Sequence, residues 1–100
     1  MIHRFVKLTF KDHHISQFID HFKSVKGNIQ SSPGCHSVKL VQSTHQPNVF
    51  FTYSTWDNAE ALDLYRQSPF FKATWQKVKQ WFSAPPEAWS TKIPEELKSF

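Results

Sequence analysis

Large aromatic side chains surround a Ser-Pro pair in the second half of the chain, and they are the strongest sign of chemistry in this sequence. The stretch WDNAEALDLYRQSPFF covers residues 56–71. Tyr65 lies just before the pair Ser68-Pro69, and Phe71 and Trp75 follow it. These rings could wall a pocket for a flat aromatic molecule. They could also fill a packed core, and the sequence pattern alone favours that interpretation, because aromatic residues at helical spacing usually pack in a core.

The other reactive residue types form no recognisable site. The six histidines show none of the spacings typical of a metal site, and they are interpreted as surface residues, although His14 and His21 share one helix face. Cys35 is the only cysteine, so an intrachain disulfide is excluded. We expect it to be a small buried hydrophobic residue and not a nucleophile. The sequence therefore predicts no metal site.

Length and composition indicate one small folded domain. The chain has 100 residues, of which 39% are hydrophobic and 16% aromatic. The net charge is +4, but the lysines are scattered, which favours a solvated surface over a nucleic-acid site. The opening MIHRFVKLTF alternates apolar and polar residues, and no stretch is long enough to span a membrane. These features predict a soluble, cytoplasmic protein.

Hydrophobic periodicity predicts the elements of the first half. Residues 2–10 alternate as in a strand, although Phe5 places a ring on the polar side. Residues 13–30 carry apolar side chains at helical spacing, with Asp12 as the expected N-cap. Residues 35–43 and 49–56 are expected strands, and the second is aromatic on both faces, which indicates that both faces are covered.

The second half is predicted to contain an interrupted helix. Asp57 begins it, with Glu60 at capping-box spacing. Ser68 can then cap a new helix with Pro69 in its first position, running to about Phe82. Residues 88–93 are an expected fourth strand. The restart would let this helix bend over the sheet and leave space beneath it.

The order β-α-β-β-α-β is the ferredoxin-like α+β arrangement, a four-stranded antiparallel sheet with helices on one face. The predicted domain spans residues 1–93, and residues 94–100 form a polar tail. The bare face of such a sheet can pack against a second copy, and the aromatic residues of both parities suggest this.

Several of these features together resemble the antibiotic biosynthesis monooxygenase family. The first strand follows Met1, a Pro-Gly-Cys turn occupies residues 33–35, a strand ends at Trp56, and a Ser-x-x-Phe element covers residues 68–71. The resemblance implies dimeric α/β barrels made by two facing sheets, with a pocket between sheet and helices in each subunit. Some members oxygenate phenolic or quinol-type substrates without metal or flavin, whereas a related branch binds and degrades haem.

The resemblance also directs attention to particular positions. The Asn, Trp and His of the haem branch correspond to Val6, Tyr65 and Trp75 here, so haem degradation is not expected. Many quinol-oxidising relatives have a His at the position of Tyr65, and a tyrosine hydroxyl is a poorer base because its ordinary pKa is near 10.

For a cofactor-free oxygenase of a phenolic or quinol-type aromatic, the residues divide into two roles. Tyr65 is the candidate proton acceptor or orienting hydroxyl, and Arg4 could stabilise the developing oxyanion, unless it is only a solvated charge at a strand end. The candidate substrate-binding residues are Val6, Phe51, Phe71 and Trp75.

Two other functions fit the same elements. The first is a dimeric protein of this fold that binds a small ligand without turnover. The second is an RNA-binding domain, because residues 48–53 place aromatic side chains on a third strand, but the glycines and basic residue of that signature are absent. We therefore expect a homodimer through the open sheet face, no cofactor, and neither nucleic acid nor membrane as a partner.

Overall fold

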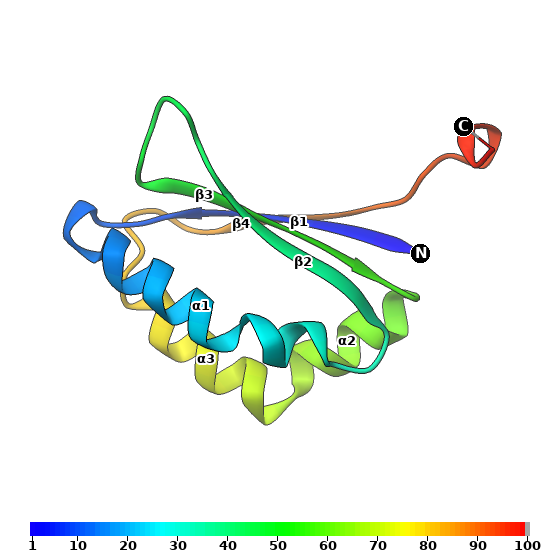
Figure 1. Ribbon diagram of the computed structural model, residues 1–100, viewed down its shortest axis with the longest axis horizontal. Helices are drawn as coiled ribbons and strands as arrows, with labels where there is room; N and C mark the ends of the chain where they lie inside the picture. Colours follow the sequence, from blue (N-terminus) through cyan, green and yellow to red (C-terminus); the bar gives the residue numbers. More distant parts are fainter. Residues whose placement is uncertain (100) are drawn as a thin grey trace.

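The computed structural model describes residues 1–99 and has the predicted ferredoxin-like α+β fold. Four strands form one antiparallel sheet in the order β2-β3-β1-β4. The three α-helices all lie on one face of this sheet, and the opposite face carries no helix within the described residues (Figure 1). The strands are β1 (Ile2–Thr9), β2 (Cys35–Gln42), β3 (Val49–Trp56) and β4 (Glu87–Thr91).

The helices are α1 (Ile15–Gln30), α2 (Ala59–Gln67) and α3 (Pro69–Lys79), and there are two short 3-10 turns, η1 (Asp12–His14) and η2 (Glu95–Leu97). The predicted elements therefore all exist, in the predicted order. Boundaries differ by a few residues, most of all at the end of α3. There the chain leaves the helix early because Trp81 and Ser83 make backbone hydrogen bonds with Lys11 and Thr9.

Strand register decides which side chains face the helices. Leu8 of β1 pairs with Phe50 of β3, and both are buried in the core beneath α1. Phe10 is fully buried and stacks on Phe18 of α1 at 4.2 Å between ring centroids. The alternation of β1 thus places Arg4, Val6 and Leu8 toward the helices.

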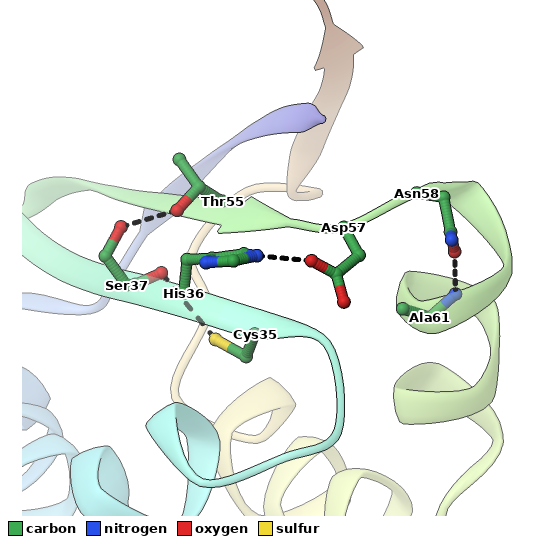
Figure 2. A network of polar contacts seen from close by, with 7 residues as sticks. All are labelled: Cys35, His36, Ser37, Thr55, Asp57, Asn58 and Ala61. Atoms are coloured by element: carbon green, nitrogen blue, oxygen red, sulfur yellow. Dashed lines mark hydrogen bonds and ion pairs between the residues drawn. The ribbon is translucent and has the colours of Figure 1, made fainter.

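The predicted helix caps are only partly correct. Asp12 does not cap α1, because it lies inside η1 and no side chain caps the start of α1. Asp57 does not cap α2 either. Its backbone N–H donates to the carbonyl of Gly34. Its carboxylate pairs with His36, so Asp57 is bonded to the start of β2 directly after β3 ends at Trp56 (Figure 2).

Asn58 is the true N-cap of α2, one residue later than predicted. Its side-chain oxygen accepts a 2.9 Å hydrogen bond from the N–H of Ala61 (Figure 2). The next cap is as predicted: Ser68 lies between α2 and α3, and Pro69 is the first residue of α3. Asn58 and Ser68 therefore set the two helical segments that cover the sheet beside α1.

Candidate functional site

The bend between α2 and α3 is produced by Ser68. Its backbone is extended, with φ −68° and ψ 149°, and so cannot continue a helix. Its hydroxyl donates to the carbonyl of Tyr65 at 2.6 Å and accepts from the N–H of Phe71 at 3.1 Å. One side chain thus ends α2, starts α3 and holds Tyr65 and Phe71 near each other.

A cavity of about 320 Å³ lies beneath this bend, between the sheet and the helices. Pockets for small molecules usually measure roughly 300–1,000 Å³, so this one suits a small ligand. Its walls come from β1, β2, β3, the segment around β4 and all three helices. The lining includes Arg4, Val6, His21, Trp56, Tyr65, Arg66, Phe71 and Trp75.

Aromatic rings form a continuous wall of the cavity. The Tyr65 ring contacts Trp56 at 4.8 Å and Phe71 at 5.2 Å between centroids. Phe71 stacks on Trp75 at 5.8 Å with an interplanar angle of 13°. Such rings offer apolar faces to a flat molecule. The cavity shows that the aromatic residues around the Ser-Pro pair do not all fill a solid core.

Tyr65 is held in a protonated state well above neutral pH. Burial raises its pKa to about 12, and the negative charge of the nearby Cys35 sulfur, when ionised, acts in the same direction. A phenol with this pKa is a hydrogen-bond donor under ordinary conditions and an unfavourable proton acceptor. Of the two roles predicted for Tyr65, its environment favours the orienting hydroxyl.

Arg4 extends from β1 into the same cavity and is positioned by β4. Its Nη1 donates a 3.0 Å hydrogen bond to Oγ of Ser90, which is its register partner. Partial burial lowers the pKa of Arg4, and the positive charge of Arg66 lowers it further, while Asp63 acts in the opposite direction. Arg4 is therefore more than a solvated strand-end charge, because its guanidinium is partly withdrawn from water beside a cavity.

The structure brings together five of the six predicted site residues. Arg4, Val6, Tyr65, Phe71 and Trp75 all line the cavity. The exception is Phe51, which pairs with Lys7 and so lies on the opposite face of the sheet. Its place among the substrate-binding residues is corrected accordingly.

His21 lines the cavity from α1, and the sequence prediction had placed it on the surface. Its Nε2 is buried without a hydrogen-bond partner among residues 1–99, and its ring meets Trp81 edge-on at 5.9 Å. Burial lowers the pKa of His21, and Lys77 of α3 adds to this effect. The signal was available, since His21 lies three residues after Phe18 and four before Val25 on the apolar side of α1.

The face of the sheet without helices carries its own aromatic row. Phe5 is the register partner of Tyr53 on one side and Trp89 on the other. Phe5 and Tyr53 stack at 4.8 Å, and Trp89 remains 46% exposed. Trp89 therefore lies outside the core, whereas Trp56 at the end of β3 is almost fully buried.

Two further findings concern metals and membranes. Within residues 1–99, no three His, Cys, Asp or Glu side chains are grouped so that they could hold a metal ion. In the same part of the chain, no helix combines the length and the apolar character needed to cross a membrane.

The fold and cavity define a ferredoxin-like α+β protein with an aromatic pocket between its sheet and its helices. The family model described as antibiotic biosynthesis monooxygenase matches residues 1–77. The chain belongs to this family.

Solved structures agree with the fold. A crystal structure of an antibiotic biosynthesis monooxygenase has a TM-score of 0.88 and 14% identity, covering 94% of this chain and 99% of that one. A conserved protein from Methanosarcina mazei also reaches 0.88, with 18% identity, covering 93% of this chain and 92% of that one. At these identities the likeness concerns the fold alone.

A sequence relative is the protein sll1783 from Synechocystis, which is 32% identical over 66 residues. The match covers 66% of this chain and 45% of that protein, so it spans less than half of the relative's length.

Proposed function

We propose that the protein is a cytoplasmic, cofactor-independent monooxygenase that acts on a phenolic or quinol-type aromatic molecule. The observation that carries this proposal is the cavity in which Tyr65, Phe71 and Trp75 offer aromatic walls and Arg4 offers a partly buried positive charge. Family membership supports oxygenation as the reaction type.

The chemistry assigns each residue a task. The phenol releases its proton to solvent, the phenolate passes an electron to dioxygen, and the two radicals combine. The peroxide so formed takes up a proton and loses water, which leaves a quinone. A phenol and dioxygen thus give a quinone and water, with one oxygen atom retained in the product. Arg4 would stabilise the phenolate, which promotes its ionisation, and the Tyr65 hydroxyl would donate a hydrogen bond that orients the ring. The apolar walls, including Val6, would limit water around the anion.

The proposal includes a homodimer through the open sheet face. Phe5 and Trp89 are exposed there, and half-buried Tyr53 stacks on Phe5. A second sheet packed on this aromatic row would remove it from water. Phe51 lies on this face as well, so its proposed role is in dimer contacts. RNA binding would need the same rings to be free.

Incubation with 1-naphthol and isotopically heavy dioxygen tests the activity. Mass spectrometry should find one heavy oxygen atom in the quinone, at a rate above buffer. Tyr65→Phe should slow the reaction by about tenfold to a hundredfold, and Arg4→Gln by more, because the phenolate loses its counter-charge. Lys72→Gln removes a charge outside the cavity lining and should retain the wild-type rate. A product without the heavy atom would contradict the proposal.

Binding without turnover is the second candidate. The observation in its favour is the raised pKa of Tyr65, which removes the one side chain that the sequence had offered as a proton acceptor. Saturable binding of 1-naphthol with no heavy-oxygen product would select this function.

A further inference from the structure

Two arginines from different elements line the same cavity. Arg4 belongs to β1 and Arg66 to α2. Their guanidinium groups are close enough for the charge of Arg66 to lower the pKa of Arg4. The ion pairs among residues 1–99 use Lys7, His36 and Lys98 as cations, so neither arginine has a carboxylate within salt-bridge distance there.

This arrangement has an electrostatic cost within the protein. Two like charges lie near each other beside a mainly apolar cavity, and Arg4 is also partly desolvated. Asp63 is the opposing charge that acts on Arg4, and it counters only part of the repulsion. A bound anion would relieve the repulsion, because it would be attracted by both cations.

The geometry also suits recognition of a planar anion. Ser90 accepts from Nη1 of Arg4, which fixes the guanidinium on the sheet side of the cavity, and Arg66 approaches from the helix side. A guanidinium fork matches a carboxylate with paired hydrogen bonds. The aromatic wall of Phe71 and Trp75 belongs to the same cavity.

We propose that the natural ligand of the cavity is an aromatic acid, whose carboxylate is bound between Arg4 and Arg66 and whose ring lies against Phe71 and Trp75. An aromatic acid narrows the substrate class of the proposed function. This inference rests on the proposed function only because both treat this cavity as the substrate site. The acid group is a binding element and does not react. Arg4 would contact both the carboxylate and the reacting phenol oxygen, because a guanidinium has five N–H donors, so the two groups would be neighbours on the ring.

A matched pair of redox-inert probes tests this inference without turnover. 2-Naphthoate and 2-naphthamide have nearly the same shape and differ in charge. Isothermal titration calorimetry at neutral pH should show that the wild-type protein binds 2-naphthoate at least about tenfold more tightly. Added salt should weaken the binding of 2-naphthoate and leave that of 2-naphthamide nearly unchanged.

Variants assign the preference to the two arginines. Arg66→Gln should reduce the preference to a few-fold, and because Arg66 is exposed in α2 this variant is expected to fold. Arg66→Lys should recover part of the preference for 2-naphthoate. Arg4→Gln should also reduce this preference. Lys72→Gln loses the same charge outside the cavity lining and should keep the full preference.

Equal binding of the two probes by the wild type would overturn the inference, as would a preference that survives in both Arg4→Gln and Arg66→Gln. If neither 2-naphthoate nor 2-naphthamide binds, the inference is overturned too. The proposed oxygenation is tested separately with 1-naphthol, which has no carboxylate, so either proposal can fail while the other stands.

Discussion

The hydroxyl oxygen of Ser68 accepts a 3.1 Å hydrogen bond from the backbone N–H of Phe71. This contact is the reason for the interrupted helix. It lets α3 begin in a new direction immediately after α2, and the cavity lies beneath the change of direction. A continuous helix would have no free N–H at Phe71 and would not place Tyr65 and Phe71 on the same wall.

Replacement of Ser68 by alanine should therefore weaken both the fold and the site. Loss of an N-cap of this kind costs about 1 kcal/mol of unfolding free energy, or about 4–8 °C in Tm for a domain of this size. Calorimetry or circular dichroism measures the shift. Ser24→Ala is the matched control, since Ser24 only donates to the His21 carbonyl on an exposed helix surface, and it should cost nothing. Equal effects of the two variants would contradict the role of Ser68.

Local sequence signals were sufficient for the elements and for this cap. Alternation, helical spacing and the Ser-Pro pair each act over a few neighbouring residues, so they can be interpreted from the chain alone. Asn58 was missed because Asp57, with Glu60 three residues later, offered an equally good local signal. Only the contacts of Asp57 with Gly34 and His36, which are distant in sequence, show that Asp57 is bonded to the start of β2 and does not cap α2.

The site depended more on tertiary structure. The aromatic wall followed from the spacing of Tyr65, Phe71 and Trp75, but Phe50 and Phe51 gave β3 an aromatic residue on each face, and register alone decided between them. The approach of Arg66 to Arg4 joins a helix to a strand and has no local signature.

Gly34 should be irreplaceable in the turn before β2. Its φ of +82° is in the left-handed region, and a Cβ there would lie 2.5 Å from the Cβ of Ala61. Gly34→Ala should lower the unfolding free energy by more than about 1 kcal/mol. Gly27→Ala is the control: a Cβ at this helical position meets nothing within 4 Å, and it should stabilise the protein by up to about 1 kcal/mol. Urea unfolding measures both, and a stable Gly34→Ala variant would be inconsistent with this turn.

The raised pKa of Tyr65 should make the protein sensitive to alkali. The unfolded chain releases the tyrosine proton near pH 10, whereas the folded protein retains it until about pH 12. The unfolded state therefore binds fewer protons in this range, and stability must fall as the pH rises through it. Urea unfolding at several alkaline pH values, with tyrosinate absorbance as a second readout, measures the effect. Tyr65→Phe should flatten this decline, and Tyr53→Phe should preserve it; an unchanged slope in Tyr65→Phe would refute the assignment.

The exposed aromatic row should decide the oligomeric state. Trp89→Glu would place a charge on the edge strand β4, within the proposed sheet-to-sheet contact, where burial of an unpaired carboxylate is strongly unfavourable. Light scattering after size exclusion should give the mass of a dimer for the wild type and of a monomer for this variant. Leu64→Glu is the control, because Leu64 is 68% exposed on α2, away from the open face, and it should remain a dimer. A wild-type monomer at micromolar concentration would rule the dimer out.

His21 should contribute to loss of stability in mild acid. Burial and Lys77 lower its pKa, so the unfolded chain takes up a proton near pH 6.5 before the folded protein does, and stability falls as the pH drops below that value. The charged or titratable groups that share its cavity are Arg4, Tyr65 and Arg66, and none of these is a carboxylic acid that could favour a protonated imidazole.

His21→Phe fills a similar space and removes the unpartnered Nε2, so it should be as stable as the wild type at neutral pH and less sensitive to acid. Thermal unfolding between neutral pH and about pH 5 compares it with His45→Phe, which removes an imidazole from the exposed loop before β3. Identical acid sensitivity in the two variants would show that His21 has no part in the effect.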